Sequence, residues 1–300
     1  MSLNSVNTNI AAQVALQSLN ATNSSLQATQ KRISTGYRVA DATDDGAAFA
    51  VAQKVRSDVG ALTTVNQQLG SAKGLVGTAV TSLTNISTSV GTAKQLLVDI
   101  GNQSISDDQR NQYITSFKNL VTQVANSVDG SSYNGQTLLG KTGVSGSASS
   151  QNVINSDTGT SSTLTGEDSS TLANALASLI GLSFTRSGGT DTFTSVSSSA
   201  AQTAAATALT STVAGGFSTL QSGVLNQLNQ AGSDSNLLDA TISFNSTKID
   251  SLNAGLGALI DADLSKESAN LQALQIRQQL GTQSLSLANQ APQALLSLFK

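Results

Sequence analysis

The last stretch of the chain, residues 261–300, constrains the fold more than any other part of the sequence. Its apolar residues recur at steps of three, four and seven positions, which is the spacing of an α-helix. One stripe is formed by Ala269, Ala273, Ile276, Leu280, Leu287, Ala291, Ala294 and Leu298, and another by Leu264, Leu271, Leu274 and Leu285. Because the two stripes lie well apart around the helix, this helix needs partners on two sides.

Residues 1–33 carry the same double pattern. One stripe is formed by Leu3, Val6, Ile10 and Val14, and another by Ala12, Ala15, Leu19, Leu26 and Ile33. The second stripe has heptad steps from Leu19 to Ile33, as in a coiled coil. If one stripe of each terminal helix joins the two ends of the chain, the other stripes stay uncovered, which predicts contacts with other copies of the molecule. An ordinary intramolecular bundle is the alternative interpretation.

The composition excludes several classes of function. The chain has no Cys and no His, so it lacks thiol nucleophiles, Ser-His-Asp triads and the usual zinc sites. Charged residues make up 11% of the sequence and the net charge is −3, with no basic patch and no long apolar run. Carboxylate, Lys and Ser chemistry remains possible, but we expect no enzyme activity, no cofactor, no nucleic-acid partner and no membrane span. A weakly charged surface instead favours dense packing of identical copies.

Helix start and stop signals divide the amino-terminal half. Gly36 suits the C-cap of the first helix, and Asp44 and Asp45 suit the N-cap and first turn of a helix that covers residues 47–100. Three glycines inside this second helix either weaken it, break it or let a neighbour approach closely: Gly70, Gly74 and Gly77. A third helix is predicted for residues 107–130.

The middle of the chain differs in character from both ends. Residues 141–199 are rich in Ser, Thr, Gly and Asn and have few apolar anchors. Within them, residues 172–182 suit a short helix, and residues 183–196 predict a β-hairpin that turns at a Gly-Gly pair. Helices then return, with one apolar stripe over residues 209–228 and a bend or break over residues 232–235. The chain therefore has helices at both ends and a polar insertion between them.

Two short motifs are candidates for chemistry. Residues 135–142, GQTLLGKT, fit the phosphate-binding pattern G-x-x-x-x-G-K-[ST], but a helix end precedes them and a poor helix follows, so the strand–loop–helix context is missing. Residues 41–46, DATDDG, place Asp41 and Asp45 at calcium-loop positions, but Ala52 stands where such a loop needs Glu. Helix capping is the favoured interpretation of the second motif.

Longer motifs lie at three places along the chain. The carboxyl end carries DADLSKESANLQALQIRQQLG and LANQAPQALLSLF, the amino end carries NSVNTNIAAQVALQSLN and KRISTGYRVADATDDGAAFAVA, and YNGQTLLG lies at residues 133–140. In this order they resemble bacterial flagellins, the subunits of the flagellar filament. The resemblance covers roughly residues 1–140 and 221–300.

The resemblance implies a mainly α fold. Both chain ends would build a long antiparallel helical bundle or coiled coil, with a small middle insertion that contains the β-hairpin. Residues 1–40 and 264–300 would be terminal helices of an inner tube domain. Residues 41–140 and 200–263 would form a helical core domain, and residues 141–199 a small outer domain.

The resemblance also implies a function and partners. The chain would be a structural subunit that assembles with itself into the extracellular flagellar filament for swimming motility. It would leave the cell through the flagellar type III export channel without a cleaved signal peptide. An export chaperone, a filament cap and hook-junction proteins would be its other partners. The alternatives are a hook–filament junction protein, disfavoured by the motif APQALLSLF, a P-loop nucleotide-binding protein, and a soluble helical adaptor that never polymerises.

Particular residues are expected to carry the assembly. The predicted polymer contacts are Leu19, Leu26, Ile33, Leu271, Leu274, Ile276, Leu280, Leu285, Leu287 and Leu298. In a free monomer the chain ends cannot bury enough apolar surface, so we expect them to be disordered until assembly. In enteric flagellins a Toll-like receptor recognises an Arg-rich helical segment; residues 91–99 here keep only Lys94 and Leu96 of that pattern. Because Lys does not replace Arg at a bidentate site, we predict weak recognition.

Overall fold

The computed structural model describes residues 9–144, 147–212 and 215–298, with side chains described up to residue 290. Its helices are α1 (Ile10–Thr35), α2 (Gly46–Gly101), α3 (Asp107–Asp129), α4 (Leu172–Ser178), α5 (Ser198–Thr210), α6 (Phe217–Ile260) and α7 (Leu264–Leu298). Its strands are β1 (Ser132–Tyr133), β2 (Gln136–Thr137), β3 (Gln151–Ile154), β4 (Ser161–Leu164), β5 (Phe184–Ser187) and β6 (Thr190–Phe193). They form three separate antiparallel pairs of consecutive strands. The predicted mainly α class, with long helices at both ends and a hairpin in the middle, is confirmed.

The chain divides into two compact units. The first, which we call the terminal unit, contains the chain up to Gly60 and from Ile249 onward. The second, which we call the central unit, is Ala61–Lys248. The long helices α2 and α6 contribute to both units. The division into three domains that the sequence suggested stays a prediction.

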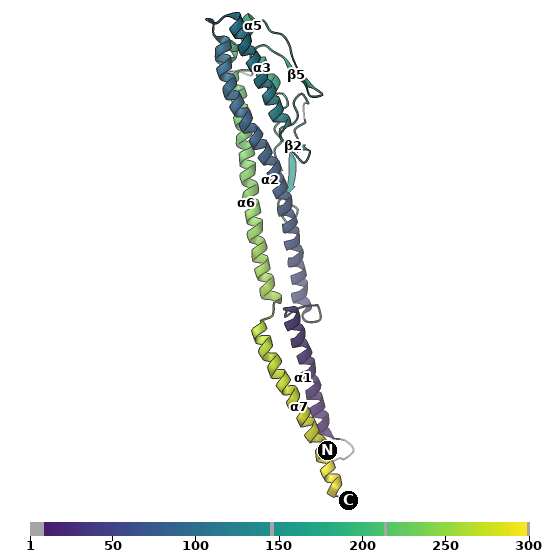
Figure 1. The fold of residues 1–300 in the computed structure, drawn as a ribbon. Coiled ribbons are helices and arrows are strands. Elements are labelled where there is room, and N and C mark those ends of the chain that lie inside the picture. The colour runs from purple at the N-terminus through teal and green to yellow at the C-terminus, as the bar shows by residue number, and fades with distance from the viewer. Residues whose placement is uncertain (1–8, 145–146, 213–214, 299–300) are drawn as a thin grey trace. The chain divides into compact units, whose positions relative to one another are not determined.

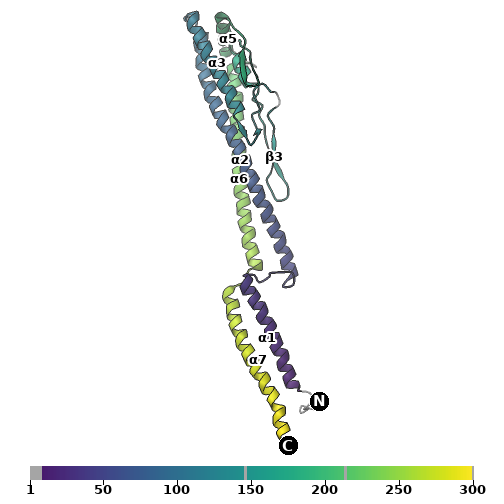
Figure 2. The same ribbon diagram turned by 45° about the vertical axis from the view of Figure 1, so that its right-hand side comes forward.

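In the terminal unit α1 and α7 run antiparallel, side by side (Figures 1 and 2). Asn9 caps the start of α1, where its side-chain oxygen accepts a hydrogen bond from the Ala12 N–H. Gly36 ends the helix at a φ of 74°, a conformation that costs glycine little because it has no Cβ. The predicted C-cap is therefore confirmed. At the start of α7, Asp263 accepts hydrogen bonds from two N–H groups of the first turn.

The connector after α1 and the connector before α7 pair with each other. The Arg38 N–H donates to the Ile260 carbonyl at 2.7 Å, and the Ala262 N–H donates to the Gly36 carbonyl at 2.9 Å. Next to them lies a small apolar core formed by Val39, Ala48, Ala52 and Ile260, with Phe49, Leu256 and Leu259 packed against it. The paired connectors thus set where α1 ends and where α7 begins.

The central unit has one continuous apolar core, to which α2, α3 and α6 all contribute. Both views show α3 lying along α2 (Figures 1 and 2). The largest fully buried side chains that α2 and α3 contribute to the central unit are Leu62, Leu69, Leu83, Ile86, Leu97 and Ile100 of α2 and Phe117 of α3. The helix predicted for residues 107–130 is confirmed as α3, and Ser106 and Gln109 form a capping box at its start.

Two arginines, the buried Arg110 and the partly buried Arg186, tie segments of the central unit together. The Arg110 guanidinium donates to the Asn102 carbonyl at 2.9 Å, just past the end of α2, where the helix dipole favours a cation. The Arg186 guanidinium of β5 binds Asp191 of β6 and lies 2.8 Å from the Asp129 carboxylate at the end of α3. These two carboxylates, Asp191 most of all, raise the pKa of Arg186 above its ordinary value. The β5–β6 hairpin is thereby fixed to α3.

The predicted hairpin and short helix of the middle region are confirmed as β5–β6 and α4, and a further hairpin was missed. In β3 and β4, Gln151 pairs with Leu164, and Val153 pairs with Ser162. Only Val153 and Leu164 of these strands are buried, so the alternation of apolar and polar residues was too weak to predict strands. At the hairpin tip, the Lys248 ammonium of α6 binds the Asp157 carboxylate at 2.8 Å.

Two predictions about α5 and α6 were wrong. The apolar stripe predicted over residues 209–228 suggested one helix, but α5 ends at Thr210 and α6 begins at Phe217, with Gly215 at a φ of 95° between them. That stripe includes Val213, which lies outside the described residues. The break predicted over residues 232–235 does not occur, because α6 is continuous from Phe217 to Ile260. Asp234 within this segment is buried, as are Ala231 before it and Leu238 after it, and this packing keeps α6 helical.

The glycines of α2 do not break it, because the helix is continuous from Gly46 to Gly101. A close approach occurs at Gly74, where an added Cβ would lie 2.8 Å from the Tyr133 Cζ atom. At Gly70 and Gly77 an added Cβ would meet no atom within 4 Å. One of the three glycines therefore has a packing role in the described structure.

Candidate functional site: a surface for self-association

The two terminal helices meet along one apolar seam. Six half-buried side chains lie on the facing sides of α1 and α7: Leu19, Leu26, Ile33, Leu271, Leu274 and Leu285. Gly281 lets the helices approach closely, since a Cβ there would lie 3.2 Å from the Leu19 Cδ1 atom. This seam is the intrachain contact that the heptad pattern predicted.

Polar contacts along the seam fix its register. The Asn9 side-chain amide donates to the Ala288 carbonyl at 2.8 Å, and the Gln278 amide donates to the Asn23 side-chain oxygen at 2.8 Å. Near the connectors, the Arg32 guanidinium lies 3.5 Å from the Glu267 carboxylate, which is almost buried. Each of these three contacts joins one particular residue of α7 to one particular residue of α1 or its N-cap. A shift of one helix along the other would therefore break all three contacts.

Each terminal helix leaves a second apolar face uncovered. We call the exposed residues Ile276, Leu280 and Leu287, which lie along one line of the helix, the outer stripe of α7, and the exposed residues Ile10, Val14 and Leu16 the outer stripe of α1, where Leu16 lies about 160° around the helix from Val14. Their exposed fractions range from 44% at Ile10 to 71% at Leu287. Leu280 also borders a groove between the two helices that Ala15, Leu19 and Gly281 help to line. Large apolar side chains in such numbers mark a surface that another protein covers.

The outer stripes stand in a nearly uncharged surface. The sequence has no charged residue from Ile10 to Gln30 of α1, and from Ser268 to Gln290 of α7 it has Arg277 alone. Like-charge repulsion between copies is therefore weak on these faces. In the central unit, Leu237 and Phe244 of α6 form a second exposed apolar patch, with Phe244 67% exposed.

The structure separates the residues that were predicted to make polymer contacts. Six of them lie in the intrachain seam, and three lie on the outer stripe of α7: Ile276, Leu280 and Leu287. The side chain of Leu298 lies outside the described residues, as do Leu3 and Val6 of the predicted amino-terminal stripe. Ile10 and Val14 belonged to that stripe but were not among the predicted contacts, and Leu16 fits neither sequence stripe of α1.

The aspartates that follow α1 form an ionic contact with its last turns. The Lys31 ammonium lies 2.6 Å from Asp41 and 3.0 Å from Asp44. Hydrogen bonds from Lys31 lower the pKa of both carboxyls, and the carboxylates, Asp41 first, raise the pKa of Lys31. Asp45 accepts hydrogen bonds from the N–H groups of Ala47 and of the next residue in α2. Helix capping, the favoured interpretation of this motif, is confirmed.

The motif at residues 135–142 does not have phosphate-binding geometry. Gly135 and the residues after it form the turn and second strand of the β1–β2 hairpin, and Lys141 makes an isolated bridge to Val144. No described helix starts at Lys141, because the next one is α4. The Thr142 hydroxyl is buried and donates to the Ala125 carbonyl at 3.2 Å. The P-loop alternative is therefore not favoured.

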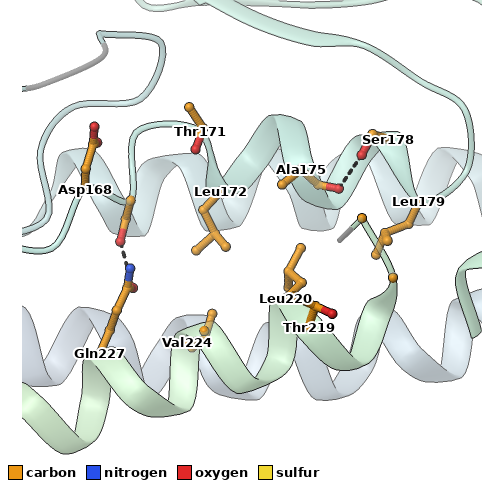
Figure 3. Close-up of a pocket in the computed structure, with 14 residues that line it drawn as sticks. Asp168, Thr171, Leu172, Ala175, Ser178, Leu179, Thr219, Leu220, Val224 and Gln227 are labelled. Carbon is orange, nitrogen blue, oxygen red and sulfur yellow. Dashed lines mark hydrogen bonds between the residues drawn. The ribbon is translucent and has the colours of Figure 1, made fainter. Parts of the chain in front are cut away.

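A pocket between α4 and α6 carries no evident chemistry. Figure 3 shows Leu172, Leu220 and Val224 pointing into it, while at one end the Ser169 hydroxyl donates to the Gln227 side-chain oxygen at 2.9 Å.

Across the part of the chain that the structure describes, no group of three or more acidic residues could hold a metal ion. Likewise, no described helix has both the length and the apolar character needed to cross a membrane.

The segment proposed to face an immune receptor lies on α2 in the central unit. The Lys94 side chain is exposed, with its ammonium 5.9 Å from the centre of the Phe217 ring. Leu96 is half-buried and packs against the core. The expected weak recognition stays a prediction.

Known proteins with similar sequences cover this chain from end to end. The family model for the bacterial flagellin N-terminal helical region matches residues 6–143, and the model for the C-terminal helical region matches residues 220–299. Flagellins FljO and FljK of Caulobacter vibrioides are 34% and 32% identical to it over the full length of each pair. A flagellin of Brucella melitensis is 33% identical over 99% of both chains. Flagellins are structural proteins and not enzymes. The chain belongs to the bacterial flagellin family.

Proposed function

We propose that this chain polymerises into the extracellular flagellar filament by burying the outer stripes of α1 and α7 against neighbouring copies. The main observation in support of the proposal is that each of these helices has two apolar faces in different environments. One face of each is already covered by the seam within the chain, and the other is uncovered. Membership of the flagellin family supplies the kind of assembly, a filament built from one repeated subunit that serves motility.

The energetics of burial support this assignment. Covering one Leu, Ile or Val side chain stabilises an interface by about 1.5–3 kcal/mol. The loss of translational and rotational freedom on association costs about 4–15 kcal/mol. Several stripe residues per copy are therefore needed, and the two outer stripes provide six. The patch at Leu237 and Phe244 supplies a further contact on the central unit.

The other candidate functions lack an observation in their favour. A hook–filament junction protein would share terminal helices, but both family models and the curated relatives are flagellins. A soluble adaptor that never polymerises would leave the outer stripes without a partner. In the filament we infer that α1 and α7 form the inner tube, as the resemblance implies.

The finer points on export and partners stay proposals that rest on family resemblance. An export chaperone on the carboxyl-terminal helix, a filament cap and hook-junction proteins are the expected partners. Export is expected to proceed without cleavage of a signal peptide. Amino-terminal sequencing of subunits from sheared filaments tests this point, and a start beyond Ser2, which removal of the initiating methionine does not produce, would contradict it.

The experiment that tests the assembly surface compares two charge substitutions on α7. Leu280→Asp places a carboxylate on the outer stripe, while Gln279→Asp places the same charge one position away on the exposed polar face. We expect Leu280→Asp to abolish polymer formation and Gln279→Asp to retain it, because only the first buries a charge in an apolar contact. Polymer is measured by sedimentation and electron microscopy after addition of a precipitant or of sheared filament seeds.

Circular dichroism shows whether either variant has lost its helices. If Leu280→Asp assembles as well as the unmodified chain, the outer stripe of α7 is not the assembly surface. If both variants fail to assemble while keeping their helices, the contact extends over the polar face and the proposed stripe is too narrow.

A further inference from the structure

We propose that Asn134, at the tip of the β1–β2 hairpin, is a site of spontaneous deamidation and isoaspartate formation. The modification needs no enzyme and no cofactor, only water and an exposed Asn-Gly pair. Asn134-Gly135 is the sole Asn-Gly pair in the sequence. The inference does not rest on polymerisation, because it concerns a turn of the central unit.

The turn holds both residues in an open conformation. Tyr133 pairs with Gln136, so Asn134 and Gly135 are the two loop residues of the hairpin. Their φ angles are 51° and 78°, as in a type I′ turn. Among the described residues, Asn134 is the one residue other than glycine with a positive φ. Both loop residues are exposed to solvent.

Nothing in the described structure restrains the reacting atoms. No hydrogen bond from the described residues engages the Asn134 carboxamide or the Gly135 N–H. Around Gly135, an added Cβ would find no atom within 4 Å. Because glycine has no side chain, its nitrogen can reach the neighbouring carboxamide without steric hindrance.

The reaction balances without any other reactant than water. The Gly135 backbone nitrogen attacks the Asn134 Cγ atom and loses its proton, and the carboxamide nitrogen leaves as ammonia, so a five-membered succinimide forms. Water then opens either carbonyl of this ring. Opening at one carbonyl gives an aspartate in an ordinary backbone, and opening at the other gives isoaspartate, in which the main chain passes through the former side chain.

Two asparagines that precede a serine are protected by the helices in which they lie. Asn126 in α3 and Asn245 in α6 are each followed by a serine, and the N–H of that serine lies within a helix. Asn245 is also buried, and its amide donates to the Asn155 carbonyl at 3.1 Å. These two sites therefore serve as internal references in the same molecule.

The product would disturb a contact that the turn now holds in place. Isoaspartate adds one atom to the main chain of a two-residue loop whose register depends on loop length. Tyr133, the residue before the loop, packs its ring against Gly74 of α2. The isoaspartate form should therefore release this ring from α2, and both products add a negative charge at the hairpin tip.

The test incubates the purified full-length chain at mildly alkaline pH and measures conversion by site-resolved peptide mass spectrometry. A parallel sample unfolded in denaturant gives the rate for the unrestrained sequence, and the Asn134→Asp variant gives the standard that separates aspartate from isoaspartate. We expect conversion at residue 134 in the folded chain within about tenfold of the unfolded rate, because an exposed loop tip opens at almost no cost in free energy. Asn126 and Asn245 should convert only in the unfolded sample.

Conversion of Asn134 in the unfolded sample alone would overturn the proposal, since the folded turn would then protect the site. Equal conversion of Asn134, Asn126 and Asn245 in the folded sample would also overturn it, because the geometry of the turn would then have no part in selecting the site.

Discussion

At the level of single residues, Gly74 of α2 packs closely against the aromatic ring of Tyr133. The Tyr133 ring occupies the space where a side chain at Gly74 would begin, 2.8 Å from the position of an added Cβ. Gly70, one turn earlier, has no such neighbour. The same substitution at the two positions therefore separates the effect of helix propensity from the effect of packing.

Replacing Gly70 by Ala should raise the free energy of unfolding of the central unit by about 0.5–1 kcal/mol, because Ala favours a helix interior over Gly. Gly74→Ala should raise the free energy of unfolding by less than this, or should lower it, since the Tyr133 ring has to move. In a Tyr133→Ala background the two substitutions should have equal effects. Denaturant unfolding of the single and double variants measures these differences, and equal effects with Tyr133 present would show that the ring moves without cost.

At the level of elements, Lys31 joins the end of α1 to the connector that follows it. Its hydrogen bonds lower the pKa of Asp41 and Asp44, so this contribution to stability is present above the ordinary carboxyl pKa of about 3.9. It is lost as the pH falls through the lowered values of the folded state. The pKa of Lys31 is raised instead of lowered, so its contribution to stability depends on pH in the opposite direction. That contribution is present below about pH 10.4 and is lost as the pH rises through the pKa of the folded state.

Lys31→Gln should therefore lower the melting temperature of the assembled polymer by a constant amount between about pH 5 and 9, and the difference should shrink in acid. Turbidity during heating measures this temperature. The effect should be small, because the three groups are all partly exposed to solvent, which screens the contact. Lys54→Gln, which removes an exposed cation on α2 that has no carboxylate partner in the described structure, is the matched control. A parallel pH dependence in both variants would rule out a specific role for the Lys31 contact.

The elements themselves could be predicted where local signals and apolar periodicity agreed. The caps at Gly36 and Asp45 and the strongly periodic α3 follow from such signals. The break before α6 could not be predicted, because the apolar spacing continues across it while Gly215 turns the chain. The β3–β4 hairpin has too few apolar positions to show a period of two. For the outer stripes, periodicity showed two faces on each helix but not which face the partner helix covers.

At the scale of the whole molecule, the two units differ in how much apolar surface each buries within one chain. The central unit has a large continuous core from several helices and strands. The terminal unit has a small core at the connectors, and beyond it α1 and α7 share a seam whose leucines are only half-buried. Since burial sets the free energy of local opening, α1 and α7 should open far more readily than α3 in an unassembled chain.

Hydrogen exchange on the soluble chain and on the polymer tests this difference. Amides of α1 and α7 should exchange fast in the soluble chain and become protected in the polymer, because assembly covers the outer stripes and removes the open states of these helices. Amides of α3 should be slow in both samples. The Leu280→Asp variant, kept under assembly conditions, should retain fast exchange in α7. Equal protection of α7 and α3 in the soluble chain would mean that the intrachain seam is sufficient on its own, and that assembly adds contacts without ordering the chain ends.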